Sequence, residues 1–217
     1  MDQVQNPGIT PEERLLNAAE NTFLSAGVHR VTMDEIAASI GMSKRTVYQI
    51  IPGKEQLILR VLNRFASRIR NQVEAILDDP SISFPEKRDR YLATIANNLS
   101  KINSRLLSEI QRFFPAIFKE IDAIRARNLP QLMGKLIRQG QQTGFIKEDA
   151  DPEFISAVFL TSISGLMTQT QMERFGPSPS EIALRIARLI FEGIQRDPDE
   201  ADQSTRTGTQ QVTPEMR

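Results

Sequence analysis

Residues 32–57 read TMDEIAASIGMSKRTVYQIIPGKEQL, and this stretch decides the fold of the N-terminal part of the chain. Thr32 and Glu35 have the spacing of a capping box, which predicts the start of a short helix. Glycine in the turn 41–43 ends that helix, and a second short helix, 44–50, begins directly afterwards. Two short helices joined by such a turn are typical of a helix-turn-helix, whose second helix enters the major groove of DNA.

The second helix presents a polar face that suits DNA. Helical spacing turns Val47 inward together with either Ile50 or Ile51. The residues left on the outer face are two cations, an amide and two hydroxyls: Lys44, Arg45, Thr46, Tyr48 and Gln49. Lysine and arginine bind guanine O6 and N7 and glutamine binds adenine, so this face is predicted to recognise bases. The hydroxyls, together with Lys54, also suit contacts with phosphates.

The charge of the same region is strongly uneven. Between Ile36 and Arg70 there are seven cations and one anion, Glu55, although the whole protein has a net charge of 0. The cations are Lys44, Arg45, Lys54, Arg60, Arg64, Arg68 and Arg70. A basic run is most often only a solvated face, and glycine between helices is common. The turn, the polar face and the basic segment together favour a DNA-binding surface.

Residues 10–59 resemble the N-terminal domain of the TetR (tetracycline-repressor) family of transcription regulators, through TPEERLLNAAENTFLSAG and VTMDEIAASIGMSKRTVYQIIPGKEQLI. The positions in register with the family pattern are Phe23, Gly27, Thr32, Ile36, Ala37, Gly41, Ser43, Thr46, Val47, Tyr48, Lys54, Glu55 and Leu57. The chain departs from the pattern at three positions. Met42 and Ile51 replace other apolar side chains, and Gly53 is a weaker helix cap than the usual residue.

The resemblance implies a dimeric regulator of transcription, most simply a repressor that a small-molecule effector releases from a palindromic double-stranded DNA operator. It assigns base contacts to Lys44, Arg45, Thr46 and Gln49. It assigns phosphate contacts to Thr32, Ser43, Tyr48 and Lys54. The effector, the operator and the regulated genes are not specified by these residues, and neither is the choice between repression and activation.

Apolar spacing along the rest of the chain predicts an all-α protein of about nine helices. The helices after residue 53 are expected at 54–77, 86–102, 105–114, 116–141, 152–174 and 179–196, with Pro115 and Pro130 breaking or kinking the chain. We therefore divide the whole chain into five segments: a flexible N-terminus (1–9), the DNA-binding domain (10–53), a connecting helix (54–77), a ligand-binding and dimerisation domain (78–196) and a disordered tail (197–217).

An apolar effector pocket is expected among the helices between residues 86 and 172, as the family resemblance implies. The residues proposed to line it are Asn98, Gln111, Phe114, Phe118, Met133, Phe159 and Met167. Any one of the apolar members is more simply explained as ordinary core. Asn128 and Gln131 are further polar candidates on the same helices.

The last two predicted helices carry more apolar surface than one domain needs to cover. On 179–196 the apolar residues occupy well over half of the helix circumference, and 152–174 is similar. We therefore expect a twofold homodimer interface formed by Phe159, Ser162, Leu166, Ala187, Ile190, Phe191 and Ile194.

Several classes of function have no support in the sequence. The chain has no cysteine and a single histidine, His29, and it has no glycine-rich phosphate loop, so no cofactor, metal or catalytic site is expected. Segment 154–172 is uncharged but rich in Ser, Thr and Gln, so no membrane partner is expected, and a cytoplasmic location fits. The alternative function is a helical small-molecule-binding protein or enzyme whose DNA-binding domain does not function.

Overall fold

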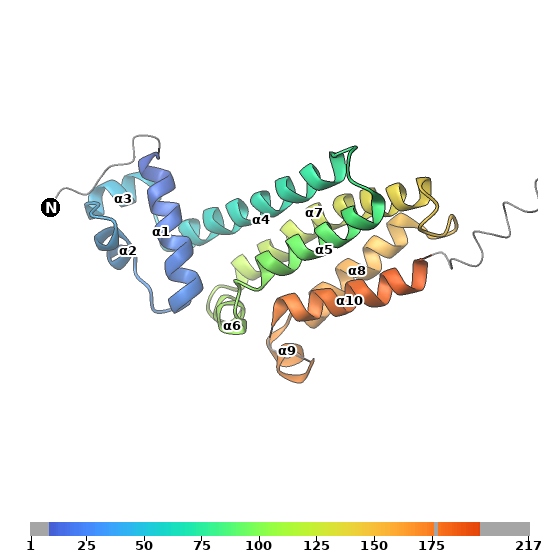
Figure 1. The fold of residues 1–217 in the computed structure, drawn as a ribbon. Helices are drawn as coiled ribbons and strands as arrows, with labels where there is room; N and C mark the ends of the chain where they lie inside the picture. The colour runs from blue at the N-terminus through green and yellow to red at the C-terminus, as the bar shows by residue number, and fades with distance from the viewer. Residues whose placement is uncertain (1–8, 176–177, 196–217) are drawn as a thin grey trace, which may run out of the picture.

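The computed structural model describes residues 9–175 and 178–195, which form an all-α protein of ten helices (Figure 1). The helices are α1 (Pro11–Ala26), α2 (Met33–Ser39), α3 (Lys44–Ile50), α4 (Lys54–Asp78), α5 (Phe84–Leu99), α6 (Ser104–Phe113), α7 (Pro115–Gln142), α8 (Pro152–Leu166), α9 (Gln169–Phe175) and α10 (Pro179–Ile194). The expected fold class is confirmed. No helix of the described residues is long and apolar enough to cross a membrane.

Helices α1, α2 and α3 form a small head at one end of the molecule (Figure 1). Capping boxes begin α1 and α2, because the hydroxyls of Thr10 and Thr32 accept the backbone N–H groups of Glu13 and Glu35 at 3.1 and 3.2 Å. The head core is apolar and buried, and it contains Ile51 rather than Ile50 as the inward partner of Val47.

Helix α4 belongs to two hydrophobic cores. Leu57 and Ile58 near its start are buried in the head core, and Val73 and Leu77 near its end are buried in the core of the larger body. At 1.5 Å per residue its 25 residues extend about 37 Å. The helix therefore joins the head to the body without a loop, as Figure 1 shows.

In the body, α5 and α7 pack against α4, and α8 and α10 pack on the far side against α7 and α5, with α6 on the side of the head (Figure 1). Helix α7 continues without interruption through Pro130, which the sequence predicted as a break or kink. Pro115 does mark a break, since only Phe114 separates α6 from α7.

Two local predictions for the C-terminal helices are wrong. The single helix expected at 152–174 is divided into α8 and α9, because the chain leaves helical geometry at Met167, after a segment rich in Ser and Gly. Ser178 and Glu181 have the spacing that predicts a capping box, but the Ser178 hydroxyl bonds Ser180 at 2.6 Å and the box does not form. The flexible N-terminus (but for Ile9) and the disordered tail lie outside the described residues.

A buried ion cluster fixes α1 to α4. Glu20 of α1 has only 11% of its side chain exposed and accepts hydrogen bonds from Arg64 at 2.8 Å and Arg68 at 2.5 Å. Burial by itself raises the pKa of Glu20, but the hydrogen bonds from Arg68 and Arg64 outweigh burial, and the pKa ends below its ordinary value.

We predict that Glu20→Gln lowers the free energy of unfolding by about 3 kcal/mol at pH 7, because it leaves two arginines without their buried anion. The folded-state pKa is lowered, so this stabilisation is complete above the unfolded pKa and is lost as the pH falls through the folded value. Urea unfolding of both proteins at several pH values measures the difference.

The matched control is Glu12→Gln, which removes the half-exposed ion pair with Arg60 between the same two helices. It should cost no more than about 1 kcal/mol. Equal losses for the two variants would contradict a special role for Glu20.

Candidate functional site

Helix α3 is oriented by one buried residue and one capping residue. Val47 is fully buried against the head core, and the Ser43 hydroxyl accepts the Thr46 N–H at 3.1 Å. The opposite side of the helix is exposed, including 47% of Tyr48. The polar face expected from the sequence thus projects from the end of the head.

Of the exposed residues on α3, the side chains of Arg45, Tyr48 and Gln49 form no hydrogen bond or ion pair with any residue in 9–175 or 178–195. The other two expected base-contact residues are engaged within the head. Lys44 forms an ion pair with Asp34 of α2, which raises the pKa of its ammonium group, and Thr46 shares a hydrogen bond with Ser43 at 2.8 Å. Arg45 and Gln49 are therefore the freest of the proposed base readers.

The proposed phosphate-contact residues also differ from one another. Tyr48 is exposed, whereas the Thr32 and Ser43 hydroxyls cap α2 and α3. Lys54 donates a hydrogen bond to the His29 carbonyl at 2.9 Å and lies 5.6 Å from the centre of the Phe114 ring. Burial lowers the pKa of Lys54, and the charges of Glu109 and Glu35 only partly oppose that shift.

The interpretation of the basic segment as one DNA-facing patch needs correction. Five of its seven cations pair with acids, and a sixth, Lys54, is held by a carbonyl. The pairs are Lys44–Asp34, Arg60–Glu12, Arg64–Glu20, Arg68–Glu20 and Arg70–Glu74. Three of the four acids lie before the counted stretch, and folding brings Glu12 and Glu20 of α1 to α4 and Asp34 of α2 to α3. The fourth, Glu74, lies after the stretch on α4 itself. Arg45 alone remains without such a partner within the described residues.

Helix α6 of the body holds the loop between α1 and α2. The Glu109 carboxylate accepts the backbone N–H groups of Val28 and His29 at 2.8 and 2.9 Å, and the Arg105 guanidinium donates to it at 2.8 Å. Gly27 has a φ of +83°, and any Cβ there would collide with the same carboxylate. No local sequence pattern indicates this contact, because about 80 residues separate the partners.

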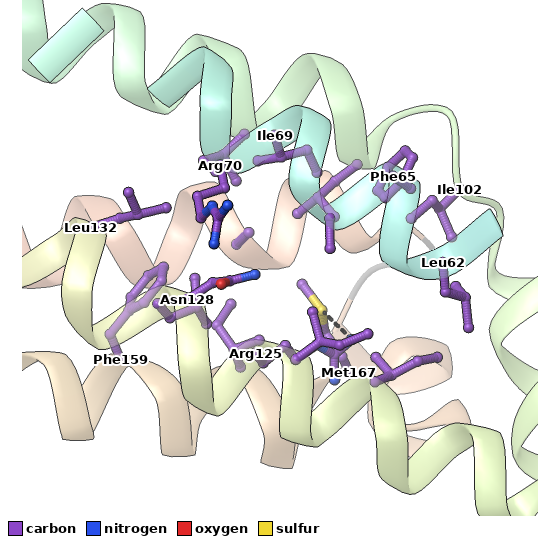
Figure 2. A pocket seen from close by; sticks show the side chains of 18 of the residues that line it. Leu62, Phe65, Ile69, Arg70, Ile102, Arg125, Asn128, Leu132, Phe159 and Met167 are labelled. Atoms are coloured by element: carbon purple, nitrogen blue, oxygen red, sulfur yellow. Dashed lines mark hydrogen bonds between the residues drawn. The ribbon is translucent and has the colours of Figure 1, made fainter. Parts of the chain in front are cut away.

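A cavity of about 160 Å³ lies in the body between α4 and α7 (Figure 2). Its wall is almost entirely apolar. It is lined by Leu62, Phe65, Ala66, Ile69, Arg70, Ile95, Leu99, Ile102, Leu107, Ile121, Ile124, Arg125, Asn128, Leu129, Leu132, Phe159, Ile163, Met167 and Ala183.

Two of the seven residues proposed for the pocket, Phe159 and Met167, line this cavity. Met133 is fully buried in the body core instead, and Phe114 and Phe118 pack against the head core. Asn98 is also buried, where its amide donates to Gln72 and to the Thr94 carbonyl at 3.0 and 2.8 Å. Gln111 lies on α6 and is not part of the wall.

The sequence analysis missed the contribution of α4 and the two arginines, because it sought the pocket only among helices after residue 86. A signal was present for Arg125. It lies on the helical stripe that carries Ile121, Asn128 and Leu132, so a cation occupies an otherwise inward-facing position.

The residues proposed for a dimer interface are mostly covered within one chain. Phe159, Ala187 and Phe191 are buried in the body core, and Ser162, Leu166, Ile190 and Ile194 are half-buried. The large apolar residues that α8 and α10 expose are Phe154, Val158 and Leu189, with Leu189 74% exposed. An interface on these helices would therefore use a neighbouring stripe.

The head is the part of the chain that identifies the protein. Residues 15–61, which include the exposed α3 and its turn, match the family model described as "Bacterial regulatory proteins, tetR family". The head therefore matches the family that the sequence resembles, the TetR family. The expected class, a DNA-binding transcriptional regulator of this family, is thereby confirmed.

Similarity to relatives extends beyond the head. The HTH-type transcriptional regulator YvaF of Bacillus subtilis (strain 168) is 24% identical over 171 residues, covering 79% of this chain and 88% of YvaF. The HTH-type transcriptional repressor DhaR of Mycobacterium sp. (strain GP1) is 22% identical over 75% of this chain and 83% of its own. A transcriptional regulator from Cytophaga hutchinsonii ATCC 33406 has the same fold, with a TM-score of 0.69 at 18% identity over 85% of this chain and 98% of that one.

We predict that Arg45→Ala relaxes the preference for one base pair of the bound DNA and costs about 1–3 kcal/mol there. Tyr48→Phe should weaken binding to all sequences alike, because a phosphate contact carries no sequence information. Fluorescence anisotropy with single-base-pair variants of a bound site measures both. Arg127→Ala on the body is the control, and an unchanged base preference in Arg45→Ala would refute the assignment.

Proposed function

We propose that this TetR-family protein is a homodimeric repressor that binds a palindromic double-stranded DNA operator and is released when a small molecule occupies the cavity. The observation that carries the proposal is the exposed face of α3, where Arg45, Tyr48 and Gln49 project without partners in the described chain. The similar relative DhaR is a transcriptional repressor, which supports repression over activation in this proposal.

The domain boundaries that we propose follow this division of roles. Residues 10–53 bind DNA, 54–77 connect the domains, and 78–196 bind the effector and form the dimer. The cavity wall includes Leu62, Phe65 and Ile69 of the connecting helix, so the effector site extends into that segment.

Two elements can transmit a change from the cavity to the head. The first is α4, which lines the cavity with its middle and enters the head core with its start. The second is α6, where Leu107 lines the cavity while Leu106 and Ile110 pack in the head core. A ligand releases DNA only if it binds more tightly to the arrangement of these helices that fits DNA poorly.

A homodimer supplies the second head that a palindrome needs. We place its interface on the exposed stripe of α8 and α10, formed by Phe154, Val158 and Leu189. Gly165 and Gly193 on the same helices have open space above them, which lets a second helix approach closely. A hydrophobic stripe on two adjacent helices is the pattern of a four-helix interface between two copies.

The test of the proposed function is binding of the full-length protein to DNA upstream of its own gene and to a random-site library. We expect a palindromic site, and the logarithm of the affinity should fall linearly with the logarithm of salt concentration, by roughly 0.9 for each phosphate contacted. Absent or salt-independent binding would instead favour a helical small-molecule-binding protein or enzyme with a non-functional head.

We predict that Leu189→Arg and Phe154→Arg each produce folded monomers with weakened operator binding, because a charge on the exposed stripe opposes burial in a dimer. Sedimentation equilibrium gives the mass, and circular dichroism verifies folding. Ile9→Arg, at an exposed apolar residue outside these helices, should remain dimeric. A wild-type protein that is a folded monomer at micromolar concentration would exclude this interface.

A further inference from the structure

The cavity between α4 and α7 has an unusual combination of shape and charge. Arg70, Arg125 and Asn128 are the polar residues of its wall, and none of the lining residues is Asp or Glu. Two cations therefore face a space that is otherwise enclosed by aliphatic, aromatic and methionine side chains.

We infer that the ligand of this cavity is a small molecule with an apolar body and a single anionic group, such as a carboxylate, which Arg125 and Arg70 bind. The inference deepens the proposed function and rests on it, because it names the chemical class of the effector.

Arg125 is the stronger argument. Only 15% of its side chain is exposed, and Asp122, its ion-pair partner at 3.0 Å, is itself 42% exposed. The other described contact of its guanidinium is with the Met167 sulfur at 3.5 Å, which is a weak acceptor. Five N–H donors thus have one carboxylate oxygen and one thioether between them.

The surroundings disfavour the charge that Arg125 carries. Burial lowers the pKa of the Arg125 guanidinium, while the charge and hydrogen bond of Asp122 oppose that shift. A buried cation is costly unless it is paired and its hydrogen bonds are satisfied. A ligand anion would supply the missing acceptors from the cavity side.

Arg70 and Asn128 complete the polar end. They extend from α4 and α7 toward each other across the cavity (Figure 2). Arg70 has one acidic neighbour, Glu74, at 3.8 Å, and both side chains are nearly half exposed, so water weakens this pair. The guanidinium can therefore turn to a ligand carboxylate, which it binds through two parallel hydrogen bonds, and the Asn128 amide can donate a third.

The size and lining of the remaining space determine the apolar part. Phe65, Ile95, Leu99 and Phe159 offer no hydrogen bond, so the body of the ligand is hydrocarbon. A cavity of about 160 Å³ is comparable to one that accepts benzene. A single ring or a short chain fits, whereas a cation would meet two like charges.

The test uses matched probes on the full-length protein. Benzoate and octanoate are compared with the neutral benzyl alcohol and octanol and with the benzylammonium and octylammonium cations, by isothermal titration calorimetry. We expect the carboxylates to bind about tenfold or more tightly than the alcohols, because a hydrogen-bonded charge pair is gained. The ammonium probes should bind least.

Arg125→Gln and Arg70→Gln should each remove the preference for the carboxylate while leaving alcohol binding near its original strength. Arg125→Lys keeps the charge and should retain part of the preference, which protects the test if Arg125→Gln fails to fold. Arg127→Gln is the control, since Arg127 lies on the same helix, is 58% exposed and is not part of the wall.

Alcohols that bind as tightly as carboxylates, an unchanged ratio in both glutamine variants, or no binding of any probe at millimolar concentration would overturn the inference. Operator binding is measured separately on the same samples. Charge-dependent carboxylate binding without release of DNA would leave this inference standing and refute the effector role in the proposed function, so the two failures are distinguishable.

Discussion

Glu20 of α1 binds Arg64 and Arg68 of α4, and this buried contact fixes the orientation of the head on α4. The recognition helix α3 lies in the head, where Val47 shares one core with residues of α1, α2 and the start of α4. A buried carboxylate with two guanidinium partners fixes the rotation of α1 about α4, because an apolar contact alone is not directional. The head is thereby held at a defined orientation on a long helix that continues into the body.

The position of the cavity follows from the same helix. The first part of α4 completes the head core, its last part completes the body core, and the stretch between them, around Phe65 and Ile69, lines the cavity. Any ligand in that space contacts the element that carries the head. The Glu109 carboxylate adds a second connection, since it binds backbone N–H groups at the start of the α1–α2 loop from a helix that also lines the cavity. The cavity and the head are thus connected directly through α4 and α6, without a long series of intermediate residues.

Charge on the surface and charge in the interior have different consequences in this protein. Arg60 and Glu12 meet in water and contribute little, whereas Arg125 is drawn into an apolar wall where its charge must be compensated. The distribution along the sequence did not distinguish these cases. Four cations of one basic stretch have different surroundings in the structure. Lys44 pairs with an acid of α2, Arg64 and Arg68 pair with a buried acid of α1, and Arg70 lies in the wall of the cavity.

Features that depend on neighbours three or four residues apart could be predicted from the sequence. The capping box at Thr32, the turn at Gly41 and the inward side of α3 at Val47 all agree with the structure. Each is a hydrogen bond or a helical stripe formed within one segment, so its energy is set locally. Ser178 shows the limit of this rule, since a nearby serine competed for its hydroxyl.

Tertiary structure alone decided which charges pair, where the cavity lies and which apolar stripe stays exposed. Glu20 and Arg68 are 48 residues apart, and Glu109 is 81 residues from Val28, so no local pattern could join them. Asn98 and Met133 are residue types common in pockets, but both are buried in the core. Arg70 and Arg125 are of a type common on surfaces, but both line the cavity. The physical reason is that periodicity tells which side of a helix is covered, whereas the packing of distant helices decides what covers it and where space remains.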